Sequence, residues 1–172
     1  MRKWRSSFLY LICLLSDLIA TIPFLLIWGI WGRNAGFEKK PPMFEGGKPT
    51  PGVWCLVCSL KPEVLKFWKY SAITLAPHII IYRDYARDEE GWSKIQDHEH
   101  VHVEQYESAC LIGLVIGLLL LSNPSFWLMS LAIWGVSPWV YMGSGYAVAW
   151  IRGESLYRGS VNEEAAYSIA ES

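Results

Sequence analysis

One nine-residue stretch of this chain carries residue types that can bind a metal ion and move a proton. It reads DHEHVHVEQ over residues 97–105 and contains the pattern His98-Glu99-x-x-His102. Residues four apart in an α-helix differ by about 40° around the axis, so the two imidazoles lie one turn apart on one face. Both can therefore reach one ion at about 2 Å. Glu99 is offset from that face and can address a water molecule instead of the metal.

This arrangement suits hydrolysis assisted by a metal ion. Zinc polarises a carbonyl and lowers the pKa of water, while a carboxylate takes the proton and delivers it to the leaving amine. The pattern is expected by chance roughly 0.006 times in a chain of this composition; the alternative is a polar helix that happens to carry histidines. His100 and Glu104 are predicted on the opposite face, as a surface or packing histidine and a solvated carboxylate. Gln105 returns to the metal face, where it can support a ligand.

Two histidines are not a complete catalytic zinc site, which usually has three protein ligands and an open position. Residues 157–170 predict a second amphipathic helix that contains the adjacent carboxylates Glu163 and Glu164. Small residues and an aromatic flank Glu163 at helical spacing, whereas a second apolar stripe lies nearer to Glu164. Spacing alone therefore leaves both carboxylates open as the third ligand, with a purely solvated helix as the alternative.

Long apolar blocks predict that these helices belong to a membrane protein. The chain has 172 residues, of which 52% are hydrophobic and 18% charged. Residues 8–31 are apolar behind a basic flank, and about 20 helical residues cross a hydrocarbon core. We expect a retained anchor and not a cleaved signal peptide, because the run is long and no cleavage pattern follows it. Asp17 within it is expected to be a protonated carboxyl that faces another helix.

A second pair of apolar segments predicts an antiparallel helical hairpin. Residues 109–121 and 126–150 are apolar, and residues 122–125 (SNPS) predict the turn between them. A hairpin returns the chain to the side from which it entered the membrane. Residues 152–172 are therefore expected beside residues 94–107, where the two predicted halves of the metal site would meet.

The histidine motif and the later helix together resemble a known group of enzymes. HEHVHVEQ, followed downstream by Glu163-x-x-Ala166-Tyr167, resembles the gluzincin type of zinc metallopeptidase in a minimal form. Its position next to apolar segments is similar to that in membrane-bound HtpX-like endopeptidases, which have Asp where this chain has Tyr167. The segment ITLAPHIIIY resembles the strand that such enzymes place beside the substrate. The resemblance covers about residues 70–107 and 154–170.

The resemblance also implies roles for individual residues. In that family two histidines and a glutamate bind zinc, and the glutamate of HExxH is the general base. These roles correspond to His98, His102 and Glu163 as ligands of Zn²⁺ and to Glu99 as the base. Candidates for stabilising the oxyanion are Tyr85, Tyr157, His78 and Tyr167, which the sequence does not rank.

The predicted fold class is α+β: a mostly helical integral membrane protein with three transmembrane helices and a small zincin-like domain at the membrane surface. Residues 1–31 form the anchor and 32–69 a connector, whose Gly- and Pro-rich part over residues 32–52 is expected to be a loop. Residues 70–172 form the metallopeptidase domain, interrupted by the hairpin at 109–150. Within it, residues 72–82 predict two short strands or one strand kinked at Pro77.

The net charge and the cysteine content exclude one class of partner and one class of fold. A net charge of −1 argues against nucleic acid. Four cysteines are too few for a disulfide scaffold. Cys55 and Cys58 are open as a disulfide, a redox pair or two buried thiols, and Cys13 and Cys110 are expected to be packing residues.

The predicted function is that of a membrane-bound zinc-dependent peptidase acting on a peptide or protein. The alternative is a non-catalytic structural or assembly protein of the membrane with a vestigial or structural metal site. The expected location is a multi-pass integral membrane protein in the lipid bilayer. Basic residues lie on both sides of the predicted spans, so the orientation stays open.

Overall fold

The computed structural model describes most of the chain, as helices around a small sheet. The described residues are 2–39, 44–45, 48–49, 54–61, 63, 71–83, 89–155 and 159–170. Within them the helices are α1 (Arg2–Trp31), α2 (Glu89–Leu120), α3 (Trp127–Ile151) and α4 (Val161–Ala170), with a 3-10 turn η2 (Pro124–Phe126). The strands are β1 (Gly32–Lys39), β2 (Phe44–Glu45), β3 (Lys48–Pro49), β4 (Trp54–Leu60), β5 (Ala72–Ala76) and β6 (Ile79–Tyr82). The mostly helical α+β class is therefore confirmed.

The larger sheet contains four strands in the order β1-β4-β6-β5. β4 and β6 are parallel, and the other two pairs are antiparallel. The prediction of two short strands over residues 72–82 is confirmed by β5 and β6. Pro77, which has no backbone N–H to donate, lies in the turn between them. β5 is an edge strand, so no other described strand pairs with its outer side.

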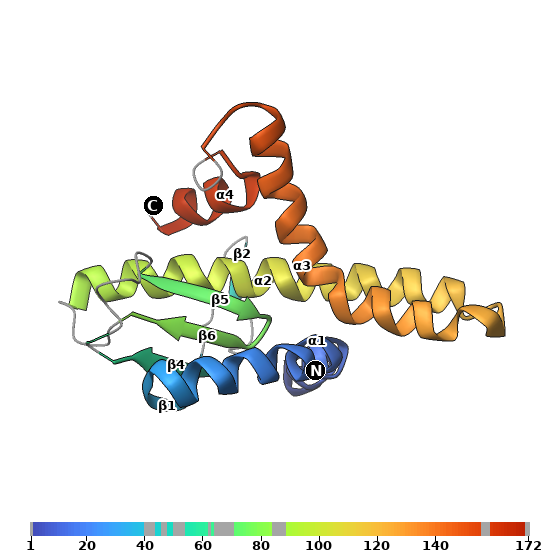
Figure 1. Ribbon diagram of the computed structural model, residues 1–172, viewed down its shortest axis with the longest axis horizontal. Coiled ribbons are helices and arrows are strands. Elements are labelled where there is room, and N and C mark those ends of the chain that lie inside the picture. The colour runs from blue at the N-terminus through green and yellow to red at the C-terminus, as the bar shows by residue number, and fades with distance from the viewer. Residues whose placement is uncertain are drawn as a thin grey trace.

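Helices cover both faces of this sheet. Successive side chains of a strand point to opposite faces, and β6 shows the consequence. Ile81 packs in one buried cluster with Phe24 of α1, whereas Ile80 packs in another with Val103 of α2. Figure 1 shows β5 and β6 between α2 on one side and α1 on the other. Each fully buried Ile stabilises this arrangement by about 1.5–3 kcal/mol.

The first part of the predicted connector is not a loop. Residues 32–39 form β1, which pairs with β4 along its whole length. The sequence of β1 has no alternating apolar pattern. β1 is nevertheless a strand, because its backbone hydrogen-bonds with that of β4, and this pairing does not require a buried side-chain face. α1, predicted as a membrane anchor, also packs on the sheet, since Ala20 and Phe24 belong to its core.

α2 and α3 form the predicted helical hairpin. The turn over residues 121–123 leads into η2, where the Asn123 side chain accepts a hydrogen bond of 3.0 Å from the backbone N–H of Ser125. Glycines allow the two helices to approach closely. A Cβ added at Gly113 would collide with Ser137, and one at Gly117 would lie 3.0 Å from the carbonyl oxygen of Ser130.

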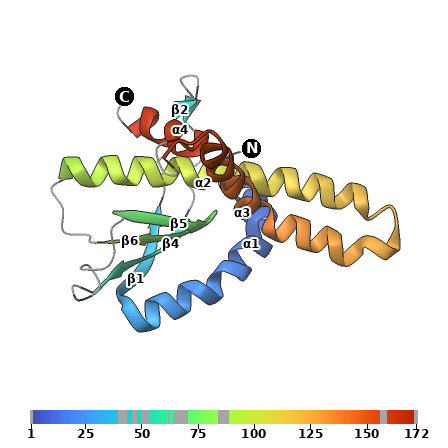
Figure 2. The same ribbon diagram turned by 45° about the horizontal axis from the view of Figure 1, so that its top comes forward.

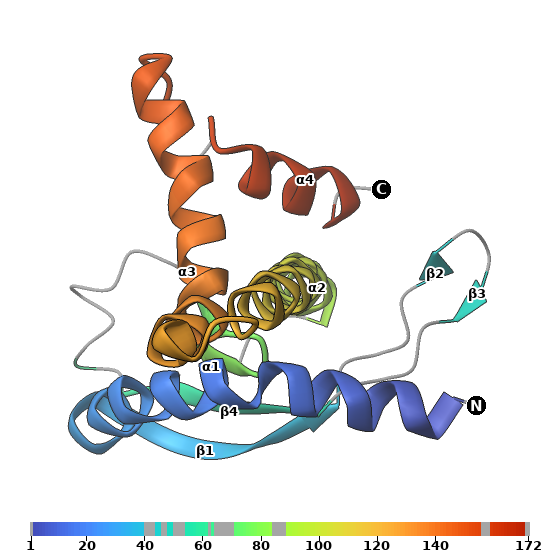
Figure 3. The same cartoon turned by 90° about the vertical axis from the view of Figure 1, so that its right-hand side faces the viewer.

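The second half of α3 turns away from α2. The chain then returns to the first half of α2 as α4. Pro138 lies inside α3, and a proline within a helix is a usual cause of a bend. Figures 1 and 2 show α3 beside the end of α2 and then turning away from it. α4 lies beside the first half of α2 (Figure 1), and Figure 3 shows it above α2 in a view along that helix. The prediction that the C-terminal helix lies beside residues 94–107 is confirmed, and α2 begins at Glu89, a few residues before the predicted start near Ser93.

Two helices are long and apolar enough to cross a membrane, judged by length and composition. They are residues 10–31 of α1 and residues 94–120 of α2. The third predicted span, α3, has no charged residue but falls short of the same hydropathy test, because it is rich in Trp, Tyr, Gly and Ser. Apolar side chains of the hairpin are nevertheless exposed. They include Leu111, Ile112, Val115, Leu118, Leu119, Leu128, Leu131 and Val140.

Candidate metal centre

Three buried side chains from two helices converge at one point. His98 and His102 lie one turn apart on α2, and their Nε2 atoms are 3.2 Å apart. α4 brings Glu163 to the same point, with Oε2 3.3 Å from His98 Nε2 and 3.5 Å from His102 Nε2. These residues form a group that can hold a metal ion.

The protonation of His102 makes its Nε2 atom an electron-pair donor to an ion. His102 Nδ1 lies 2.9 Å from the amide oxygen of Gln105, which can only accept a hydrogen bond, so Nδ1 carries the proton and Nε2 the lone pair. Oε2 of Glu163 is buried and makes no hydrogen bond with a described residue. Converging acceptors in a buried place are unfavourable without a positive charge between them. A divalent cation would supply that charge.

Glu163, and not Glu164, is the carboxylate that lies beside the histidines. Glu163 is 2% exposed, whereas Glu164 is exposed to solvent. Their neighbours follow the same division: Asn162 and Ala166 are buried, and Ala165 is exposed. The face of α4 that packs on α2 is therefore the one that carries Glu163. The stripe near Glu164 is not the packed face, since its described side chains are exposed.

The charge on Glu163 is stabilised by its surroundings. Burial by itself raises the pKa of this carboxyl, but the nearby His102 and His98 rings and the hydrogen bond from Tyr146 outweigh burial and lower the pKa to about 2. Glu163 is therefore ionised at neutral pH, which is the state that a carboxylate needs to bind a metal ion.

Neighbouring polar groups hold these residues in place. Gln105 joins α2 to α4, because its amide oxygen lies beside His102 Nδ1 while its amide N–H donates to the carbonyl of Asn162 at 3.0 Å. The Tyr146 hydroxyl of α3 donates to Glu163 Oε1 at 2.7 Å. The predicted support from Gln105 is thus present in the structure, whereas Tyr146 was missed. Tyr146 lies in an apolar segment far from the motif, where the sequence carries no local signal for it.

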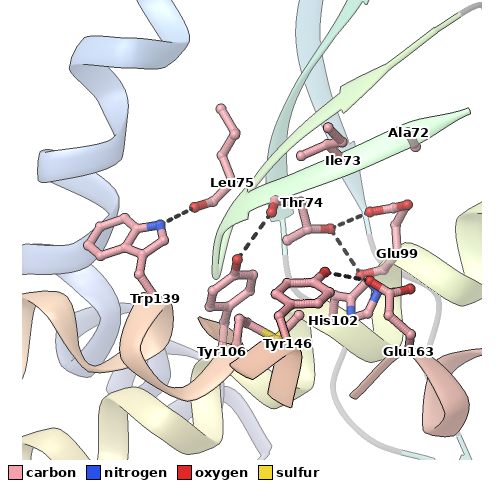
Figure 4. A pocket seen from close by; sticks show the side chains of 11 residues that line it. Ala72, Ile73, Thr74, Leu75, Glu99, His102, Tyr106, Trp139, Tyr146 and Glu163 are labelled. Carbon is pink, nitrogen blue, oxygen red and sulfur yellow. Dashed lines mark hydrogen bonds and ion pairs between the residues drawn. The ribbon is translucent and has the colours of Figure 1, made fainter. Parts of the chain in front are cut away.

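Glu99 lies beside this group at the wall of a cavity. It is 4% exposed, and the Thr74 hydroxyl of β5 donates to its Oε2 at 2.7 Å. The cavity has a volume of about 570 Å³ and lies between β5 and α3. Glu99, His102 and Glu163 all line it (Figure 4).

Aromatic side chains attach β5 to the helices around this cavity. The Tyr106 hydroxyl of α2 donates to the carbonyl of Thr74 at 3.3 Å, and the Trp139 indole of α3 donates to the carbonyl of Leu75 at 2.8 Å. Figure 4 shows both bonds at the edge of β5. These two bonds therefore connect β5, α2 and α3 around the cavity, and Glu163 of α4 completes its wall.

The predicted candidates for oxyanion stabilisation do not form one group. The ring of Tyr167 packs against that of His98, with centroids 4.6 Å apart. His78 lies elsewhere, in the turn between β5 and β6, and it does not line the cavity. Tyr85 and Tyr157 lie outside the described residues. His100 is buried and therefore a packing histidine, not a surface one.

His78 belongs to a second buried cluster of charged groups, which joins α1 to α2. Its Nδ1 lies 2.6 Å from Asp17 Oδ2, and its Nε2 lies 3.4 Å from Glu107 Oε1. Burial lowers the pKa of His78, but the hydrogen bond with Asp17 and the nearby Glu107 side chain outweigh burial and raise it to about 9. His78 is therefore protonated at neutral pH. Asp17 does not face a helix, as predicted, but lies against this turn, where it also accepts a hydrogen bond of 3.1 Å from the backbone N–H of His78.

The cysteines belong neither to the candidate metal centre nor to the cluster around His78. All four are buried, and none of them forms a disulfide within the part of the chain that the structure describes. Cys58 belongs to the apolar cluster on the α1 face of the sheet, and Cys55 to the cluster on the α2 face. Of the three predicted alternatives for this pair, two buried thiols is the one that the structure contains. Cys13 and Cys110 pack together between α1 and α2, as predicted.

No protein-family model, no curated protein and no solved structure matches the chain.

Proposed function

We propose that this protein is a membrane-bound zinc-dependent peptidase. The observation that carries the proposal is the spacing of the three donor atoms, which lie 3.2, 3.3 and 3.5 Å apart. Ligand atoms at about 2.0–2.1 Å from a tetrahedral zinc ion are about 3.3 Å from one another. Two histidines and one carboxylate are also a recurrent ligand set of catalytic zinc, which keeps one position open for the reaction.

In the proposed reaction, the residues of the chain supply binding, orientation and proton transfer. Zinc, when bound by His98, His102 and Glu163, acts as a Lewis acid and lowers the pKa of water. Glu99 accepts the proton from the attacking water and delivers it to the leaving amine. The hydrogen bond from Thr74 orients the Glu99 carboxylate toward the cavity.

We further propose that the substrate is an extended peptide bound along β5. β5 is an edge strand, and pairing of an added strand with the edge of a sheet is a common way of binding extended peptides. Residues 72–75 of β5 line the cavity that contains Glu99. A peptide paired with β5 would therefore pass directly over the proposed metal site.

The proposed location of the enzyme is the lipid bilayer, with α1 and the α2–α3 hairpin as three spans. No charged residue occurs between Glu107 and Arg152, and the hairpin exposes large apolar side chains. Helices are suited to the bilayer because their backbone hydrogen bonds are made internally. The small residues between α2 and α3 are typical of helix contacts within membranes.

The rival function is a non-catalytic membrane protein with a structural metal ion. A structural zinc site is closed by four protein ligands. The group that the described residues form has three, and Glu99 is hydrogen-bonded to Thr74 beside the cavity. This arrangement favours a site with an open position and a nearby base.

The test is a comparison of the full-length protein with Glu99→Gln, both purified in detergent. Metal content is measured by mass spectrometry, and hydrolysis with a library of quenched fluorescent peptides. We expect about one zinc ion per chain in both proteins. Hydrolysis should occur only with the unaltered protein, stop on chelation and return with zinc.

Three results would contradict the proposal. Metal-free protein after purification and zinc addition would remove the metal site. Zinc retained without hydrolysis of any peptide, or with equal hydrolysis by Glu99→Gln, would exclude the proposed mechanism; the former would favour the structural role.

A further inference from the structure

The two oxygens of the Glu163 carboxylate have different surroundings. Oε1 accepts a hydrogen bond of 2.7 Å from the Tyr146 hydroxyl. Oε2 faces the Nε2 atoms of both histidines and has no hydrogen bond with a described residue. One oxygen is therefore engaged by the protein, and the other is available to an ion.

This difference decides how the carboxylate can bind a metal. Carboxylates bind metals through one oxygen or through both. An oxygen that already accepts a short hydrogen bond has less electron density to offer, and its direction is set by the donor. With Oε1 engaged, Glu163 contributes one ligand atom, so the two histidines and Glu163 occupy three positions of a tetrahedron. Binding through both oxygens would fill a fourth position with protein.

The placement of Tyr146 depends on a close contact between α3 and the start of α4. Gly145 lies at this contact, where an added Cβ would be 2.5 Å from Asn162 Nδ2 and 2.8 Å from Ser160 Oγ. The Asn162 amide is also within 3.5 Å of the carbonyls of Tyr141 and Met142 on α3. Asn162 and Glu163 are adjacent. The contact between Asn162 and α3 therefore also sets the position of the Glu163 carboxylate relative to Tyr146.

We propose that Tyr146 is a positioning residue that restricts Glu163 to binding the metal through Oε2 alone and so keeps the fourth position open. The inference rests on the proposed metal site and adds a residue of the hairpin to it. Tyr146 acts through Glu163 and needs no contact with the substrate.

The experiment uses Co²⁺ in place of zinc, because the visible absorption of Co²⁺ reports its coordination number and geometry. Full-length protein, Tyr146→Phe and the control Tyr141→Phe are loaded with Co²⁺ in detergent. Phe keeps the ring of Tyr146 and removes only the donor. Tyr141 is a matched control, since it lies on the same helix, is exposed, and contributes only its backbone carbonyl to the contact.

We expect intense four-coordinate absorption bands from the unaltered protein and from Tyr141→Phe. Tyr146→Phe should give the weaker bands of a five-coordinate ion, because the freed Oε1 joins the coordination. Its affinity for Co²⁺ should also fall by about 10–100-fold, the loss that is typical when a residue that orients a ligand is removed.

The outcomes separate this inference from the proposed function. A Tyr146→Phe spectrum and affinity equal to those of the unaltered protein would overturn the inference and leave the metal site intact. A lower melting temperature with an unaltered spectrum would also overturn it, because Tyr146 would then act only in packing. If the unaltered protein binds neither Co²⁺ nor Zn²⁺, the proposed metal site fails and the inference fails with it.

Discussion

At the scale of single residues, Glu163 and Glu164 share their charge and differ in their surroundings. Glu163 is buried against two histidines and a tyrosine hydroxyl, whereas Glu164 is exposed to solvent. Adjacent residues of a helix point about 100° apart, so a single face of α4 cannot present both to α2. This difference allows one position to serve as the control for the other.

Replacing each glutamate by Ala should separate ligand from surface residue. We expect Glu163→Ala to lose zinc at micromolar concentration, because a buried ligand is removed, while Glu164→Ala keeps about one zinc ion per chain. Zinc stoichiometry of the two purified variants is the measurement. Loss of zinc from Glu164→Ala alone would place the ligand one residue later, and retention by both would exclude α4 from the site.

The low pKa of Glu163 predicts how the metal-free protein depends on pH. The carboxyl has a pKa of about 2 in the folded protein and an ordinary value of 4.5. Between these values the unfolded chain binds more protons, so stability falls as the pH is lowered through this window. Glu163→Gln cannot lose this contribution, since it never has the charge.

Thermal unfolding of chelated protein measures this effect. The difference in melting temperature between the unaltered protein and Glu163→Gln should shrink as the pH is lowered from about 5 toward 2. A difference that stays constant over the whole window would mean that the charge of Glu163 does not stabilise the fold.

At the scale of elements, the site depends on two helix contacts and one edge strand. α4 contacts α2 through Gln105 and contacts α3 through Asn162 and Tyr146. β5 contacts α2 and α3 through Tyr106 and Trp139. α3 therefore takes part in both walls of the cavity, so its packing on α2 should affect the whole site.

Gly113→Ala tests the packing of the hairpin. An added Cβ would collide with Ser137 of α3, so the helices must separate, at a cost of about 1–3 kcal/mol. Gly143→Ala is the matched control, because a Cβ there meets nothing within 4 Å. We expect a clearly lower melting temperature for Gly113→Ala and little change for Gly143→Ala. Equal melting temperatures for the two variants would contradict the close contact.

At the scale of the whole molecule, the hairpin joins an apolar part to the part that carries the site. Lys94 and Glu164 are exposed near the site on α2 and α4, and Asn123 is exposed in the turn of the hairpin. If the hairpin crosses the bilayer, Lys94 and Glu164 share one side of the membrane and Asn123 lies on the other. The buried native cysteines leave engineered ones to report the topology.

Single cysteines at these three positions are tested with a membrane-impermeant thiol reagent on intact and inverted vesicles. We expect labelling of positions 94 and 164 from the same side and of position 123 from the opposite side. Opposite sides for positions 94 and 164 would remove the basis of a shared metal site. Labelling of position 123 together with 94 would mean that the hairpin does not cross the membrane.

The sequence alone was sufficient to predict the features that depend on neighbours in the chain. His98 and His102 share a helix face because residues four apart always do. Pro77 separates β5 from β6, and the turn over residues 122–125 separates α2 from α3, because local residue chemistry sets both. Glu163 and Glu164 showed the limit of this reasoning, since the choice between adjacent residues depends on which face of α4 is packed.

Only the tertiary structure decided which distant groups meet. β1 is a strand because β4 lies beside it, although its own sequence resembles a loop. Tyr146 reaches Glu163 from another helix, and Asp17 pairs with His78 across 61 positions of the chain. Such contacts leave no periodic pattern in the sequence, because a hydrogen bond requires only that two groups come together in space. The residues of the motif could therefore be predicted, whereas their partners became visible only in the folded chain.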